Sequence, residues 1–183
     1  SLTKVVAAVP VTTKLISQKK LSLDQSIQQF YPKFTGKWKE NMTIRHLMTH
    51  SSGLKDYHPF YQDENIKNRA DILQFIFNSE LEYKPGSKSQ YSDLGFILLS
   101  SIIEKVSRRP LNRLADSWIF QPLGMKNTQY NPPKELRAKI APTELDTVYR
   151  HRLLQGEVHD ENTYLMGGVA GHAGVFSTAE DIA

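Results

Sequence analysis

A serine and a lysine stand at the start of the chain with a spacing that suits nucleophilic chemistry. Ser1 and Lys4 are three residues apart, and residues with this spacing lie on one face of a helix. A serine hydroxyl is a poor nucleophile until a neighbouring base takes its proton, and a lysine that is partly withdrawn from water can act as that base. Tyr91, from the distant segment Tyr91-Ser-Asp93, could pass the proton to a leaving group. These residue types are the parts of an acyl-transfer site.

The S-x-x-K pattern also occurs at 17–20 and 52–55, so the spacing alone does not identify a site. Residues 17–20 fall at the end of the first expected helix, and Ser52-Gly53 predicts a turn. Only the first copy leads directly into an apolar stretch, 5–9, that could bury one side of a helix and desolvate the lysine. The alternative is that Ser1 is an ordinary terminal residue and Tyr91 a core aromatic beside a helix cap.

Composition and charge narrow the classes of function. The 183 residues are enough for one domain with a core, and the net charge of +4 comes from scattered lysines and arginines. Such scatter disfavours nucleic-acid binding, which needs a continuous basic face. No apolar run approaches the ~20 residues of a membrane span. The absence of cysteine excludes disulfides, thiol catalysis and cysteine-ligated metal within this sequence.

The expected elements are mostly helices. Residues 93–107 give the strongest helical pattern, with apolar residues at intervals of three and four and Asp93 favouring the N-terminus. A helix over 3–19 should be kinked by Pro10, because proline removes one intrahelical hydrogen bond. Other expected elements are helices over 22–30, 43–50, 69–78 and 111–120, an irregular segment over 124–150 and a hairpin within 151–166.

A glycine-rich loop, 167–174, is the second informative feature of the chain. It is followed by Ser177-Thr-Ala-Glu180, a capping box that should begin a helix. One helical turn then remains before Ala183, and a single turn has the cost of nucleation with almost none of the gain from propagation. We therefore expect residues 1–183 to be a partial domain that is truncated at both ends.

Several longer segments resemble the serine β-lactamase and penicillin-binding protein family, in particular its class C and esterase-like branch. Residues 1–6 look like the S-x-x-K helix of the family, and 42–54 (MTIRHLMTHSSGL) are similar to its TIRHLLTHTSGL segment. Residues 91–96 match its Y-x-N position, 120–125 its FxPLGM segment and 171–183 its GLFSTAEDLA segment. The resemblance covers essentially the whole chain, in order.

The resemblance implies a mainly α chain that is a fragment of the α+β serine β-lactamase/DD-peptidase-like fold, with most of the antiparallel sheet missing. It implies Ser1 as nucleophile, Lys4 as its base and Tyr91 as proton shuttle. The residues that it implies for substrate binding are Asp93, Gly171, His172 and Gly174.

The resemblance also implies a setting for this chemistry. No cofactor or metal would be needed, and the substrate would be a small molecule or a peptidoglycan-type compound in the periplasm or cell envelope. We expect apolar faces of helices 3–19 and 93–107 to be exposed where the missing sheet would cover them. The 183 residues alone are expected to be inactive.

Two departures from the family pattern bear on these expectations. Asp93 stands where the family usually has asparagine, and a carboxylate only accepts hydrogen bonds whereas an amide also donates them. This substitution weakens the case for β-lactam or peptide recognition and leaves ester hydrolysis open. His172-Ala-Gly174 matches the H-x-G pattern of the third family motif, but it precedes the helix which that motif should follow. We therefore expect His172 in a loop, and the second backbone donor of the oxyanion hole beyond Ala183.

Two other classes of function stay open. Metal binding would use imidazole and carboxylate groups, which are offered by His151, His159, Asp160, Glu161 and His172. Their spacing is not H-E-x-x-H, and the alternative is that they make polar contacts that brace the glycine-rich loop. The third class is a non-catalytic binding module that keeps the cleft without the chemistry.

Overall fold

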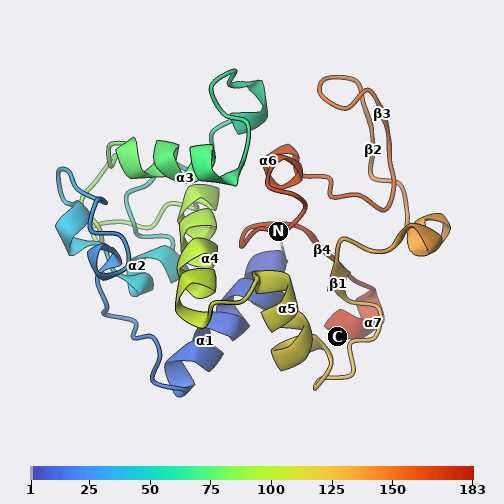
Figure 1. Cartoon of the computed structure of the whole chain (residues 1–183), viewed down its shortest axis with the longest axis horizontal. Coiled ribbons are helices and arrows are strands. Elements are labelled where there is room, and N and C mark those ends of the chain that lie inside the picture. The colour runs from blue at the N-terminus through green and yellow to red at the C-terminus, as the bar shows by residue number, and fades with distance from the viewer. Residues whose placement is uncertain (1) are drawn as a thin grey trace.

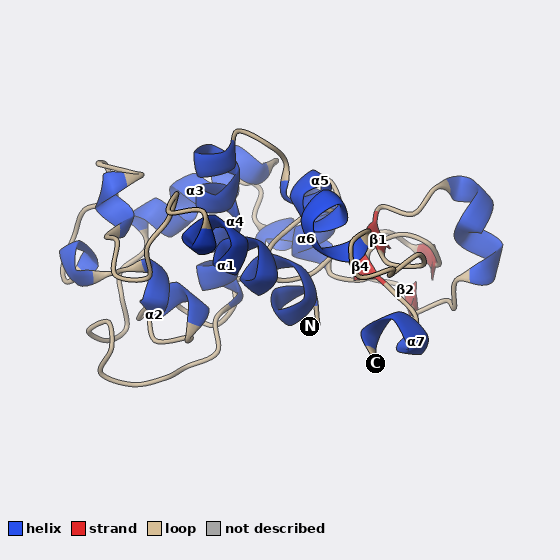
Figure 2. Cartoon of the chain, turned by 90° about the horizontal axis from the view of Figure 1, so that it is seen from below, coloured by secondary structure: helices blue, strands red, loops and turns tan. Residues whose placement is uncertain are grey.

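The computed structural model describes residues 2–183, which form a helical body joined to a smaller part that contains the strands (Figure 1; Figure 2). The helical body contains α1 (Val9–Ser17), α2 (Ile44–Met48), α3 (Arg69–Asn78), α4 (Asp93–Ser107) and α5 (Leu111–Ala115). The smaller part contains β1 (Gln129–Tyr130), β2 (Glu144–Asp146), β3 (Arg152–Leu154), α6 (Glu161–Leu165), β4 (Val175–Phe176) and α7 (Ala179–Ile182). π-Helical segments lie at Lys4–Ala8 and Asp116–Phe120, and 3-10 turns at Ile27–Gln29, Lys39–Asn41, Phe60–Gln62 and Lys134–Lys139.

The described strands form two small antiparallel sheets. In one, β1 pairs with β4 so that Gln129 lies opposite Phe176. In the other, β2 pairs with β3 as a hairpin, with Asp146 opposite Arg152. A helix-rich chain with so little sheet confirms the mainly α prediction.

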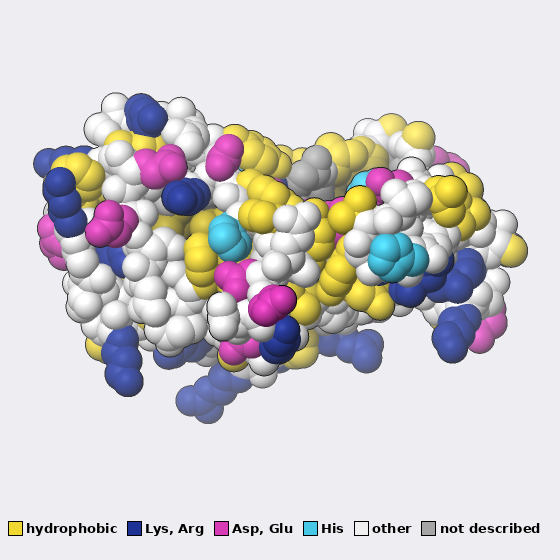
Figure 3. All heavy atoms as spheres, turned by 90° about the horizontal axis from the view of Figure 1, so that it is seen from above, with side chains coloured by type: hydrophobic (Ala, Val, Ile, Leu, Met, Phe, Trp, Pro, Cys, Tyr) yellow, Lys and Arg dark blue, Asp and Glu magenta, His cyan; other side chains and the backbone are white. Residues whose placement is uncertain are grey.

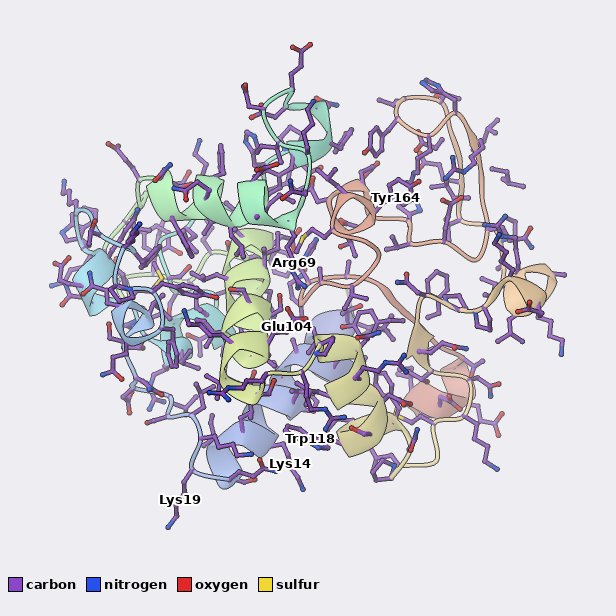
Figure 4. The ribbon with its side chains drawn as sticks, viewed as in Figure 1. Lys14, Lys19, Arg69, Glu104, Trp118 and Tyr164 are labelled. Atoms are coloured by element: carbon purple, nitrogen blue, oxygen red, sulfur yellow. The ribbon has the colours of Figure 1, made fainter. Side chains whose placement is uncertain are left out.

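Helix α4 is the centre of the core. All ten residues from Leu94 to Ile103 are buried, because α1, α2, α3 and α5 pack around this helix. The expectation that residues 93–107 expose an apolar face is therefore wrong. The side chain of Glu104 fastens the far end of α4, since it pairs with Arg69 Nη1 at 2.9 Å and accepts the Leu111 N–H at 2.9 Å (Figure 4).

Apolar surface is exposed beside the first helix instead. A groove of about 1150 Å³ lies between the π-helical segment Lys4–Ala8 and the strand-containing part. Its apolar lining includes Val6, Ile140, Phe176 and Ile182. None of the helices within residues 2–183 is both long and apolar enough to cross a membrane.

The helices and the hairpin follow the predicted pattern with several local differences. Near Pro10 the first helix changes from π to α, and it ends at Ser17. Gln25 does accept the Ser22 N–H, but the helix expected there is only the 3-10 turn that Ser26 caps. The hairpin lies at 144–154 rather than within 151–166, and Thr178 rather than Ser177 caps α7.

The central position of α4 makes a prediction about stability. Ile102→Ala removes a fully buried side chain and should lower the free energy of unfolding by about 2–5 kcal/mol. Leu123→Ala is the matched control, because Leu123 is 71% exposed and its removal should change that free energy by less than about 0.5 kcal/mol. Urea unfolding followed by circular dichroism measures both, and equal losses would contradict the central role of α4.

Candidate active site

The side-chain amine of Lys4 is the point at which three segments of the chain meet. Lys4 Nζ lies 2.6 Å from Tyr91 Oη and 2.6 Å from Asp93 Oδ1. It also lies 3.3 Å from the main-chain carbonyl oxygen of His172. The structure thus brings together Lys4, Tyr91, Asp93 and the backbone of the glycine-rich loop.

The N-terminus of α4 positions two of these groups. Ser92 caps the helix by accepting the Gly95 N–H, and its hydroxyl donates to the carbonyl of Lys55. The Asp93 N–H donates to the carbonyl of Asp56 at 2.8 Å. Tyr91 and Asp93 are therefore held on either side of a capping residue that is itself tied to the loop after α2.

The burial of Lys4 does not come from the apolar stretch that follows it. Lys4 is only 3% exposed, whereas Val5 is 60% exposed. The ring of Tyr91 at 4.5 Å and that of Phe96 at 5.5 Å from Nζ cover the lysine, together with the backbone at His172. The prediction of a desolvated Lys4 is confirmed, but distant segments desolvate it.

His50 is a component of the site that the sequence did not single out. Its ring stacks on that of Tyr91, with centroids 4.5 Å apart and an angle of 29° between the planes. Its Nδ1 accepts the Ser92 N–H at 3.0 Å. Burial, and after it the charge of Lys4, lowers the pKa of His50, so a neutral imidazole supports the tyrosine ring. The only sequence signal was its place within residues 42–54.

The side chain of His172 is 1% exposed and contacts the start of α6. Its Nε2 lies 3.0 Å from Asp160 Oδ1 and 3.1 Å from Thr163 Oγ1. The same Asp160 oxygen caps α6 by accepting the Thr163 N–H at 2.6 Å. Burial raises the pKa of Asp160, but the hydrogen bond and charge of His172, together with hydrogen bonds from Thr163, outweigh burial and lower that pKa to about 2. This dyad fixes the backbone whose carbonyl contacts Lys4.

Two glycines permit the close packing of this loop. A Cβ on Gly171 would collide with the carbonyl oxygen of Phe96, so only glycine lets the loop approach α4 this closely. Gly174 has φ +117° and lies against the ring of Tyr130 and the carbonyl of Gly168. His172 itself lies in a loop, as the motif order predicted, and not on a strand.

Two further predictions from the sequence concern the nucleophile and a metal site. Ser1, the predicted nucleophile, lies outside the described residues, and its role stays a prediction. Within residues 2–183, no three histidine, aspartate or glutamate side chains are grouped so that they could hold a metal ion. Instead, Asp160 and His172 contact each other, as the bracing alternative proposed.

The arrangement can move a proton. An ammonium that lies 2.6 Å from both a phenol and a carboxylate has two acceptors within hydrogen-bond distance. Tyr91 is 51% exposed, so its hydroxyl connects the buried lysine with solvent or with a bound molecule. Proton transfer to or from a reacting group is the work of a general acid and base.

Comparison with known proteins identifies relatives over the entire chain. A family model described as Beta-lactamase matches residues 1–183. The N-acetylmuramyl-L-alanine amidase of Bacillus subtilis is 33% identical over the whole chain, and a protein of Escherichia coli, provisionally named a D-alanyl-D-alanine carboxypeptidase, is 36% identical. The chain spans about half of each relative, 47% and 48% respectively.

Solved structures share the fold. A class C beta-lactamase from Rhodobacter sphaeroides superposes with a TM-score of 0.76 at 19% identity, over 100% of this chain and 48% of its own. EstCE1, described as a hydrolase with promiscuous acyltransferase activity, gives a TM-score of 0.73 at 24% identity, over 100% of this chain and 55% of its own.

The Asp160–His172 contact predicts how stability depends on pH. Because folding lowers the Asp160 pKa from 3.8 to about 2, the carboxylate stabilises the fold above pH 4, and this contribution is lost as the pH falls through 2. Asp160→Asn should therefore lower the free energy of unfolding by about 1–3 kcal/mol at pH 7, with the difference shrinking between pH 4 and pH 2.

The measurement is urea unfolding of both proteins at several pH values, with Glu161→Gln as a control that removes a neighbouring charge from the same helical turn. A difference between Asp160→Asn and the wild type that stays constant from pH 7 to pH 2 would contradict the assignment.

Proposed function

The chain belongs to the beta-lactamase family, and on that premise we propose that the protein is a serine hydrolase that forms an acyl-enzyme at Ser1. The observation that carries the proposal is the contact of buried Lys4 with Tyr91 and Asp93, at 2.6 Å each. We propose an amide or ester of peptidoglycan type as the substrate. The names of the two relatives, an amidase and a carboxypeptidase of cell-wall components, support this substrate class.

The proposed step exchanges one acyl bond for another. The Ser1 oxygen attacks the carbonyl carbon, a C–O bond to the serine forms, and the bond from that carbon to the leaving nitrogen or oxygen breaks. The serine proton passes through Lys4 and Tyr91 to the leaving group. A water oxygen then attacks the acyl carbon, the bond from that carbon to the serine oxygen breaks, and the proton that the water loses goes to the serine oxygen as the acid is released.

Asp93 sets a condition for this step. A lysine ammonium has to give up a proton before it can accept the one from Ser1, and only a neutral amine has the lone pair that a base needs. Both oxygens lie 2.6 Å from Nζ, but the Asp93 carboxylate can take that proton directly, whereas the Tyr91 phenol can take it only while passing its own proton on. We infer that Asp93 accepts the proton that Lys4 must release, in addition to any contact that it makes with the substrate.

The same residue favours esters as a second class of substrate. Asp93 Oδ1 is engaged by Lys4, and a carboxylate offers no N–H to the carbonyl of a substrate amide. An amide side chain at this position could pair with both the N–H and the carbonyl of a substrate amide, whereas an ester has no N–H and loses less when a carboxylate stands there. Ester hydrolysis is accordingly the second activity to assay.

Two further proposals concern the setting. We propose a location in the cell envelope, because the names of both relatives refer to cell-wall chemistry. We also propose that the 183 residues by themselves turn over no substrate, since they correspond to about half of each relative. Hydrolysis of a chromogenic ester by this purified chain would contradict the second of these proposals.

A covalent label should be attached to Ser1. Incubation of the native protein with a fluorescent penicillin or a fluorophosphonate, followed by peptide mass mapping, is expected to place the label on the peptide that contains Ser1. Ser1→Ala should abolish labelling. A label on another residue, or one that survives Ser1→Ala, would refute the nucleophile.

Lys4→Arg should abolish acylation while leaving the fold intact. A guanidinium stays protonated and cannot accept the serine proton, although it keeps the positive charge beside Asp93. The matched control is Lys14→Arg, because Lys14 is exposed further along the same run of helix and should tolerate the change (Figure 4). The rate of label incorporation measures acylation, and near-wild-type labelling of Lys4→Arg would show that Lys4 is not the base.

A further inference from the structure

Four tyrosines from three separate segments lie together at the edge where α6 faces the hairpin. Tyr61 and Tyr149 have ring centroids 5.1 Å apart, and Tyr149 and Tyr164 are 6.0 Å apart in an edge-to-face arrangement. Burial raises the pKa of the Tyr57 hydroxyl, and the neighbouring side chains of Tyr61 and Glu161 add to that rise. The set, here called the tyrosine row, is Tyr57, Tyr61, Tyr149 and Tyr164.

The tyrosine row keeps aromatic surface open to solvent. Tyr57 is 40% exposed and Tyr164 37% exposed, while Tyr61 and Tyr149 are half-buried. Tyr164 lies on α6 on the side of the hairpin (Figure 4). The space-filling view of this edge shows hydrophobic, acidic and basic side chains intermixed (Figure 3). Exposed aromatic rings beside polar groups are typical of a recognition surface.

Buried polar side chains hold the backbone beneath the tyrosine row. Asn162, 1% exposed, accepts the Phe60 N–H at 3.0 Å and donates to the His58 carbonyl at 2.8 Å. These two bonds fasten the segment of Tyr57 and Tyr61 to α6. The cost of burying an amide is offset only where its hydrogen bonds are satisfied, so this anchor fixes the loop in one position.

A second anchor fixes Tyr149. The carboxylate of Asp146 accepts the N–H groups of the three residues from Val148 to Arg150. The guanidinium of Arg150 pairs with Asp146 at 2.8 Å and donates to the carbonyls of Val158 and His159. The rings are thus arranged before any ligand arrives, which lowers the entropic cost of binding.

Hydrogen bonds tie the segments of the tyrosine row to the candidate active site. The carbonyl of Asp56, next to Tyr57, accepts the N–H of Asp93 at 2.8 Å. At the other side, Asp160 caps the helix that carries Tyr164 and contacts His172. The segments that carry the tyrosine row are therefore held directly by the segments that carry the contacts of Lys4.

The two arginines beside the Tyr164 ring are already paired. Arg150 pairs with Asp146, and its guanidinium lies 5.0 Å from the Tyr164 ring. Arg152 pairs with Glu157 at 2.7 Å and donates to the Tyr164 hydroxyl. An arginine that is paired with a carboxylate offers no net charge to a polyanion. Hydrogen-bond donors and acceptors beside flat apolar rings instead suit a neutral ligand that has hydroxyls and a flat face of C–H groups.

We propose that the tyrosine row is a saccharide subsite, which binds the glycan portion of the substrate while the adjoining acyl group reaches Ser1. This inference rests on the proposed function for its substrate class and names the part of that substrate which the row receives. Pyranose rings present C–H groups on their faces and hydroxyls at their rims, and these match tyrosine faces bordered by Arg152 and Glu157.

The kinetic test compares two substrates of the native protein. One is a disaccharide-linked peptide that ends in D-Ala-D-Ala, and the other is the same peptide without sugar. In the double variant Tyr57→Ala/Tyr164→Ala, the ratio of kcat/KM for the sugar-bearing over the sugar-free substrate should fall about three- to tenfold for each ring removed.

The binding test needs no turnover. Calorimetric titration with a tetramer of N-acetylglucosamine should show binding to the wild type and weaker binding to the double variant. Tyr57→Phe/Tyr164→Phe keeps the ring faces and should restore both readouts. Val148→Ala, a 69% exposed neighbour of Tyr149 without an aromatic ring, should leave the ratio unchanged.

The outcomes separate the subsite from the chemistry. A ratio that is unchanged in the double variant would overturn the subsite, as would a ratio that rises because the row receives the peptide instead. If the covalent reagents label no serine of the wild type and neither substrate is cleaved, the proposed function fails. The titration with the tetramer of N-acetylglucosamine then decides alone whether the subsite exists. Binding that the double variant weakens then supports the subsite, and a wild type that binds no tetramer refutes it.

Discussion

The contacts of the Lys4 ammonium are the interaction on which the rest of the site depends. A buried cation is costly unless oxygen atoms surround it, and here the start of α4 supplies a phenol and a carboxylate while the glycine-rich loop supplies a backbone carbonyl. Each of these oxygens needs its own support. Ser92 fixes the start of α4, His50 stacks under Tyr91, and the Asp160–His172 dyad holds the glycine-rich loop.

The features that could be predicted well from the sequence are those that a local pattern determines, such as the bounds of a helix. The helix over 93–107 has the predicted bounds because its apolar spacing and its N-terminal Asp93 are local signals. The meeting of Lys4 with Tyr91 followed from motif resemblance, and the loop position of His172 followed from the order of the motifs. Hydrophobic periodicity alone predicts none of these long-range contacts.

What the sequence could not give depends on three-dimensional proximity. The sequence predicts that residues 5–9 and Tyr91 desolvate Lys4. The ring of Tyr91 does cover the amine, but Val5 is mostly exposed and the second covering ring is Phe96 of α4. The partners of His172 lie nine and twelve positions away, at a spacing that matches no regular element. The hairpin was misplaced because its turn is built by the carboxylate of Asp146 rather than by glycine or proline.

The distance along the chain between the partners of Lys4 has a consequence for synthesis. The contacts to Asp93 and His172 span 89 and 168 positions, and the Val175 N–H reaches back 172 positions to Thr3. At roughly 5–20 residues per second, the ribosome delivers His172 about ten to thirty seconds after Lys4. The first helix therefore waits for this partner while 168 further residues are added to the chain. Closure of such long loops also slows folding, so the contacts of Lys4 form later than the local contacts within the helices.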